Sequence, residues 1–116
     1  MENYINLLDG TRLEATFNFG TMYYLIDSGA DKIVDRINRK KKAGQKPTNM
    51  EYMKASSKMI YAILRSNGKQ VTVDEAMSLV PPDMDEVQNI VNIFEKQLEK
   101  YKKKEMAKKN MKKTFH

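Results

Sequence analysis

The sequence predicts an α+β fold, in which an N-terminal β-hairpin packs on a mostly helical domain of about five helices with a long, Lys-rich C-terminal helix. Apolar and polar residues alternate from Leu13 to Phe19, which is typical of a half-buried strand. Farther along, a Thr or Asp cap is three times followed by Glu at the third position, which marks helix starts. From Met84 to Tyr101, apolar residues recur at helical spacing.

The expected hairpin joins Tyr4–Leu8 to Thr11–Phe19 through Asp9-Gly10, a dipeptide that suits a two-residue type I′ turn. The inward-facing residues of the second strand are expected to be Leu13, Ala15, Phe17 and Phe19. Because a lone hairpin is marginal in water, we expect helices to cover this face.

Two helices are expected after the hairpin. The first is capped by Thr21 and ends at Gly29, a residue that suits the left-handed conformation found after helix ends. The second spans Ala30–Lys42 and ends in four cations, which complement the negative end of the helix dipole.

The three capping boxes are Thr48-x-x-Glu51, Thr72-x-x-Glu75 and Asp83-x-x-Glu86. They predict a helix that ends near Asn67, a short helix over Val73–Val80, and the longest helix after it. The longest helix should pack through about Tyr101 and then become solvated or fray. The expected organisation is a single α+β domain over residues 1–101 and a basic helical extension or flexible tail over residues 102–116.

Composition argues against an enzyme. The chain has no cysteine, which excludes disulfides, thiolate metal sites and cysteine nucleophiles, and its single histidine, His116, is the last residue. The carboxylates lie mostly in first helical turns, where capping explains them, and no phosphate-binding loop, zinc spacing or dinucleotide motif is present. We therefore expect no catalytic residue, cofactor or metal. The longest apolar run, Met59–Leu64, is too short to span a membrane, which favours a cytoplasmic protein.

The net charge of +6 is concentrated near the C-terminus. Residues 96–113 contain nine lysines and two glutamates, so residues 1–95 have a net charge of −1. Spaced lysines can neutralise phosphates, but this segment lacks arginine and interleaved aromatic residues, which nucleic-acid surfaces usually contain. A solvated helix end is the favoured interpretation. The candidate basic patch within it is Lys102, Lys103 and Lys104.

A second basic patch is predicted at Arg36, Arg39, Lys40, Lys41 and Lys42. It contains arginine and lies on a helix, so it is the better electrostatic surface. An exposed helix with dipole-complementary charge remains the favoured explanation, and no glycine turn with helix-turn-helix spacing is present. Nucleic acid is therefore not expected to be the main partner.

Nine methionines are many for a chain of this length. Several of them share one predicted helix with tyrosines, and they cannot all lie on one face. Exposed methionine and tyrosine suit contact with varied apolar partners, whereas ordinary core filling is an equal alternative. The candidate partner-binding residues are Tyr23, Tyr24, Met50, Tyr52, Met53, Met59 and Tyr61.

Two stretches carry a family resemblance. Residues 5–25, INLLDGTRLEATFNFGTMYYL, place a short hairpin with an aromatic-rich second strand directly before a helix. Residues 74–104, DEAMSLVPPDMDEVQNIVNIFEKQLEKYKKK, form a short helix, a proline break and a long amphipathic helix that runs into charge. In this order of elements the chain resembles tail assembly chaperones of long-tailed phages of Gram-positive hosts. The stretches cover less than half of the chain, and the cluster Arg36–Lys46 lies outside them.

The resemblance implies a non-enzymatic protein of the bacterial host cytoplasm that binds the long, helix-rich tape-measure protein. It implies that the chaperone keeps this client soluble while tail-tube subunits polymerise, and that it is absent from the mature virion. Contact with the major tail protein, self-association and a longer frameshifted form are left open. Adaptable apolar patches on a charged carrier suit such a client, and helix-in-groove binding is the natural mode. Two alternatives remain: a small basic nucleic-acid-binding or regulatory protein, and a structural adaptor that self-assembles through the long helix.

Overall fold

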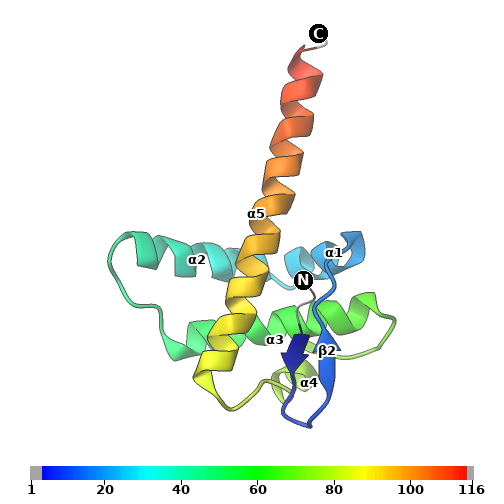
Figure 1. The fold of residues 1–116 in the computed structure, drawn as a ribbon, viewed down its shortest axis with the longest axis vertical. Coiled ribbons are helices and arrows are strands. Elements are labelled where there is room, and N and C mark those ends of the chain that lie inside the picture. Colours follow the sequence, from blue (N-terminus) through cyan, green and yellow to red (C-terminus); the bar gives the residue numbers. More distant parts are fainter. Residues whose placement is uncertain (1–3, 115–116) are drawn as a thin grey trace.

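A computed structural model describes residues 4–114, and it describes side chains for all of these except Lys102 and residues 104–114. The expected α+β class is confirmed, because a two-stranded antiparallel hairpin is followed by five helices in this part of the chain (Figure 1). The elements are β1 (Tyr4–Asn6), β2 (Arg12–Glu14), α1 (Phe19–Asp27), α2 (Ala30–Lys42), α3 (Asn49–Ser66), α4 (Val73–Met77) and α5 (Met84–Thr114).

Helix α3 is the element on which the other helices pack, since α1, α2, α4 and α5 all contact it (Figure 1). Nine of its 18 residues are buried, which is more than the single apolar stripe of a surface helix supplies. Ala55, Ser56 and Ala62 are fully buried, and small side chains there allow neighbouring helices to approach closely. The Ser56 hydroxyl donates to the carbonyl oxygen of Met53 at 2.9 Å, so its burial leaves no hydroxyl unpaired.

The hairpin is shorter than predicted, and its turn is of another type. The Leu7 amide donates to the Thr11 carbonyl at 2.8 Å, and the Gly10 amide donates to the Leu7 carbonyl at 3.0 Å. Gly10 has φ 88°, so this is a three-residue loop with glycine in the left-handed position. The predicted type I′ turn is wrong because it needs a positive φ at Asp9 as well. Within residues 4–114 only glycines have positive φ.

The second strand ends at Glu14 rather than at Phe19. Leu13, Ala15 and Phe17 pack half-buried against the core, as the alternating pattern predicts. Phe19 does not, because it is 81% exposed. It has already entered helix α1, whose side-chain directions follow a helical period instead of the strand period of two.

Helix α1 is capped by Asn18, so the prediction of Thr21 as the cap is wrong by three residues. The Asn18 side chain accepts a hydrogen bond from the Thr21 amide at 2.9 Å, and the Thr21 hydroxyl oxygen accepts one from the Asn18 amide. Thr21 is fully buried, and its hydroxyl lies 3.0 Å from the Thr16 carbonyl oxygen and 3.1 Å from Ser66 Oγ. One side chain therefore closes the α1 cap and connects the start of α1 to the end of α3.

The next three helices lie close to their predicted positions. Helix α2 has the predicted bounds, and Gly29, with φ 81°, directly follows the C-cap of α1, Ser28. Helix α3 begins after Thr48 with a complete capping box, in which Glu51 is the reciprocal partner. Helix α4 also begins at its predicted box but ends at Met77, earlier than predicted.

Helix α5 begins after Asp83, whose carboxylate accepts from the Asp85 amide at 3.0 Å. Its apolar stripe is buried through Leu98, and Tyr101 is half-buried. The helix then continues beyond the other elements to Thr114 (Figure 1). The backbone of the basic segment is therefore helical over residues 102–114, whereas His116 lies outside the described residues.

We predict that Thr21→Val lowers the free energy of unfolding by about 1–3 kcal/mol, because valine keeps the shape but leaves buried polar partners unpaired. Urea denaturation followed by circular dichroism measures this change. Thr11→Val, at an exposed position in the hairpin, is the matched control and should stay within about 0.5 kcal/mol of the parent. Equal effects of the two substitutions would contradict the structural role assigned to Thr21.

Candidate functional site

Helix α1 has an exposed apolar face. Phe19, Tyr23 and Ile26 are 81%, 58% and 49% exposed, although α1 also buries Met22 and Leu25 against the core. Large apolar side chains scattered singly on a surface need no explanation, but these three share one helix at spacings of four and three residues. They form a stripe, which we call the outer stripe of α1.

The outer stripe of α1 borders a groove on the side where α5 passes. One hollow of about 250 Å³ is lined by Phe19, Met22, Tyr23, Ile26, Asp27 and Tyr101. A second hollow of about 230 Å³ is lined by Phe17, Asn18, Phe19, Met22, Gln97, Lys100 and Tyr101. Phe19, Met22 and Tyr101 line both hollows, so the two adjoin each other. We call them together the α1–α5 groove.

The predicted partner-binding residues do not form one surface. Tyr23 lines the α1–α5 groove, and its ring meets that of Tyr24 edge-on at 5.1 Å. Tyr24 is half-buried, with the Tyr61 ring at 6.0 Å and the Arg65 guanidinium at 5.1 Å. The pair Tyr24 and Tyr61 therefore packs between α1 and α3.

The remaining candidates lie on α3 and divide into two groups. Met50 and Met53 are exposed near the start of the helix. Tyr52 and Met59 are buried in the core, which removes them from any partner-binding surface of this fold. Core filling therefore accounts for Tyr52 and Met59, whereas Met50 and Met53 remain exposed candidates for partner contact.

Sequence patterns did not identify Phe19, Ile26 and Tyr101 as groove residues. The strand pattern predicts that Phe19 lies on the inward face of the second strand, and the helical pattern places Tyr101 in the packing stripe of the long helix. Asn18 was a usable signal, because asparagine three residues before Thr21 is a favourable N-cap and would place Phe19 at the first helical position. The closeness of Tyr101 to α1 depends on tertiary packing and has no local signal.

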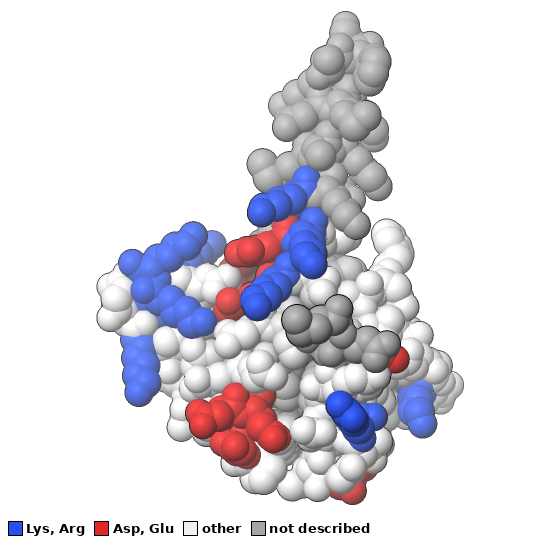
Figure 2. Space-filling view, in the orientation of Figure 1, with Lys and Arg blue, Asp and Glu red and all other residues white. Residues whose placement is uncertain are grey.

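The basic patch on α2 is partly neutralised by neighbouring helices. Lys40 Nζ lies 2.6 Å from Glu51 Oε1, and Lys41 Nζ lies 3.5 Å from Glu95 Oε1. Arg36, Arg39 and Lys42 are exposed. Figure 2 shows basic side chains gathered over α2 and the middle of α5, and acidic ones over the start of α5. In the other patch Lys103 is exposed, whereas the side chains of Lys102 and Lys104 are outside the described set.

Glu51 of α3 is the carboxylate that Lys40 of the basic patch contacts. The hydrogen bond from Lys40, followed by that from the Thr48 amide, lowers the pKa of Glu51 from 4.5 to about 2. The side chain is only 13% exposed and also completes the cap of α3. Glu51 thus joins the end of α2 to the start of α3, which is a structural role.

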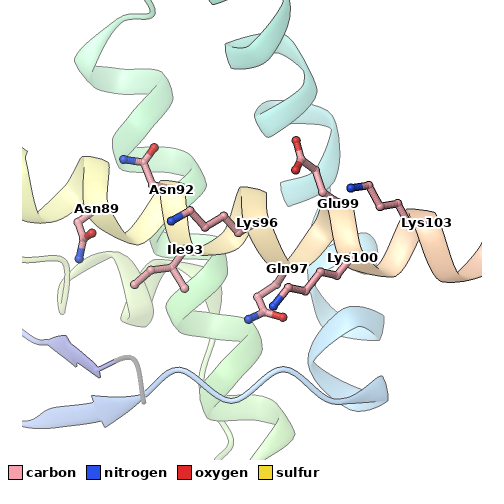
Figure 3. Close-up of a pocket in the computed structure, with 8 residues that line it drawn as sticks. All are labelled: Asn89, Asn92, Ile93, Lys96, Gln97, Glu99, Lys100 and Lys103. Carbon is pink, nitrogen blue, oxygen red and sulfur yellow. The ribbon is translucent and has the colours of Figure 1, made fainter. Parts of the chain in front are cut away.

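A further hollow, of about 570 Å³, lies along one face of α5 (Figure 3). Its lining residues all come from that helix and are Asn89, Asn92, Ile93, Lys96, Gln97, Glu99, Lys100 and Lys103. A single helix encloses no cavity, so this is shallow space between side chains that spread from one rod. Gln97 and Lys100 extend from one edge of the helix, and Glu99 and Lys103 from the other (Figure 3).

Within the described residues, no group of three or more His, Cys, Asp or Glu side chains is arranged to hold a metal ion. None of the described helices combines the length and the apolar composition that crossing a membrane requires. Comparison of the chain with protein-family models, with curated proteins and with solved structures finds no match. The candidate site therefore stands on its own geometry.

We predict that Glu51→Gln reduces stability at neutral pH and flattens its dependence on acid. The pKa of Glu51 is lower in the folded chain than its ordinary value of 4.5. Its contribution is therefore complete above that value and is lost as the pH falls toward about 2. Urea midpoints at neutral pH and at pH about 3 measure this difference.

Glu14→Gln, on the exposed strand β2, is the control for the loss of a carboxylate. A parent chain and a Glu51→Gln variant with parallel pH profiles would show that the Lys40 contact adds nothing to stability.

Proposed function

We propose that this protein is a tail assembly chaperone of a long-tailed phage, acting in the bacterial host cytoplasm and absent from the mature virion. It binds the tape-measure protein through apolar contacts and keeps it soluble while tail-tube subunits assemble. Its function is non-enzymatic. The resemblance of residues 5–25 and 74–104 to that family is the sequence argument for this proposal.

The structural observation that supports the proposal is the outer stripe of α1. A carrier for a long, apolar client needs large apolar side chains on its surface, and Phe19, Tyr23 and Ile26 provide them. It must also resist aggregation, and a net charge of +6 with lysines along α5 favours dispersion. The outer stripe lies on α1 and the lysines lie on α5, and the two helices line the same groove. A client bound to the stripe would therefore lie next to the charged helix that keeps the complex soluble.

Nucleic-acid binding is the second candidate, favoured by the exposed Arg36 and Arg39 together with the lysines of α5. One observation weighs against it as the main role. The Lys40 and Lys41 side chains are paired with carboxylates of α3 and α5, which reduces the free positive charge of the basic patch on α2.

We predict that co-expression with the tape-measure protein of the same phage moves this client from the insoluble to the soluble fraction, and that the two proteins co-purify. Apolar contacts should keep the complex intact in about 1 M salt, where exposed charges are screened. The tape-measure protein expressed alone is the control. A client that stays insoluble and unbound would contradict the proposal.

Gel-shift titration of the full chain with duplex DNA distinguishes the second candidate. The chaperone proposal expects at most weak binding that disappears as salt rises. Tight binding that Arg36→Ala and Arg39→Ala reduce would favour the nucleic-acid role instead. A helix-mediated polymer in sedimentation velocity would favour the structural adaptor.

A further inference from the structure

Helix α1 carries apolar side chains on two sides, one buried and one exposed. Its inner residues Met22 and Leu25 pack into the core, and its outer stripe occupies i, i+4 and i+7. This is the spacing of apolar anchors on a helix that packs against another helix. The outer stripe therefore suits a helical neighbour, and no described helix covers it, since its three residues remain about half or more exposed.

The two hollows of the α1–α5 groove have the size of side-chain sockets. Each measures about 230–250 Å³, below the range of about 300–1,000 Å³ typical of small-molecule pockets. Phe19, Met22 and Tyr101 line both of them. Two adjoining hollows of this size suit successive apolar anchors of a docked helix, as in other helix-in-groove complexes.

The wall that α5 contributes to the groove carries positive charge. Lys100 lines one hollow and extends with Gln97 from the same edge of α5 (Figure 3). Lys96 and Lys103 are exposed on the adjoining face, where Glu99 is the one acid among the described lining residues. Among the described residues, Asp27, at the far end of α1, is the one acid that lines the groove itself. A partner with acidic residues beside its apolar stripe is therefore electrostatically complementary to this wall.

We propose that the α1–α5 groove binds one amphipathic helix of a partner protein, whose apolar stripe fills the two hollows and whose acidic flank meets Lys100. This inference rests on the proposed function for the identity of the partner, and it specifies which segment chemistry of the tape-measure protein is recognised. The apolar anchors supply affinity, and the lysine selects the sign of the flanking charge.

The test uses the full chain and three synthetic helical peptides of about 18 residues, which is about five turns. All three carry one tryptophan in the apolar stripe, and the chain itself has none, so tryptophan fluorescence reports only the peptide. The first peptide has glutamates beside the stripe, the second has lysines there, and the third has the first composition in scrambled order. We expect the acidic peptide to bind at least about tenfold more tightly than the scrambled one and about threefold more tightly than the basic one.

Variants locate the site. Phe19→Ser should weaken binding of the acidic peptide about tenfold, because it removes the ring shared by both hollows. Met50→Ser removes another large, exposed side chain, on α3, and should leave binding unchanged. Lys100→Glu should reverse the preference between acidic and basic peptides, whereas Lys69→Glu, an exposed lysine after α3, should not. Both serine variants alter exposed residues, so the fold should persist, and circular dichroism verifies it.

Three outcomes would overturn the inference. The acidic peptide binds no better than the scrambled one, or Met50→Ser weakens binding as much as Phe19→Ser does, or the parent chain is a dimer that Phe19→Ser dissociates. In the last case the occupant of the groove is a second copy of the chain.

If the chain solubilises the tape-measure protein and Phe19→Ser does not impair this, the groove assignment fails and the chaperone function stands. If the acidic peptide binds as expected but the tape-measure protein does not, the groove stands and the proposed function fails.

Discussion

The burial of α3 on several sides is the constraint on which the rest of the structure depends. A domain this small has room for one core, and here one helix supplies its centre while four others contact it. That arrangement requires small residues where helices approach closely, and Ala55, Ser56 and Ala62 provide them. It also requires polar side chains that satisfy themselves locally, as the Ser56 hydroxyl does on the carbonyl of its own helix. A larger or unpaired polar side chain at these positions would separate α3 from its neighbours.

The connections at the two ends of α3 show how the surrounding helices are held. At its start, Glu51 completes the cap and receives Lys40 from α2. At its end, Ser66 meets the Thr21 hydroxyl, which also closes the cap of α1. In both places a side chain of an N-terminal capping box also has a tertiary partner, so the same side chain serves helix capping and helix packing. Because α1 is fixed in this way by its start and its inner face, its outer stripe can remain unburied without cost to the core.

The features predicted correctly from the sequence are those with local causes. Helix α2 and the start of α3 follow from glycine and the Thr48 cap, which act within a few residues. The predicted type of hairpin turn was wrong because the conformation of Asp9 decides between the two-residue and the three-residue loop, and the Asp9-Gly10 dipeptide suits both. The predicted end of the second strand at Phe19 was wrong because the alternating strand pattern and the start of a helix overlap there. The site was only partly predictable: Tyr23 is exposed, but Tyr52 and Met59 are buried by packing that no single-helix pattern contains.

Helix α5 joins the two properties on which the proposed function depends. Its apolar stripe is buried in the core through Leu98, and the next stripe residue, Tyr101, instead lines the α1–α5 groove. From that point the helix leaves the body, and its composition changes to lysine. The groove therefore lies at the place where α5 changes from a core element to a charged rod. A helix bound against Phe19 and Tyr101 would lie beside the emerging lysines, so apolar recognition and electrostatic selection need no further element of the fold.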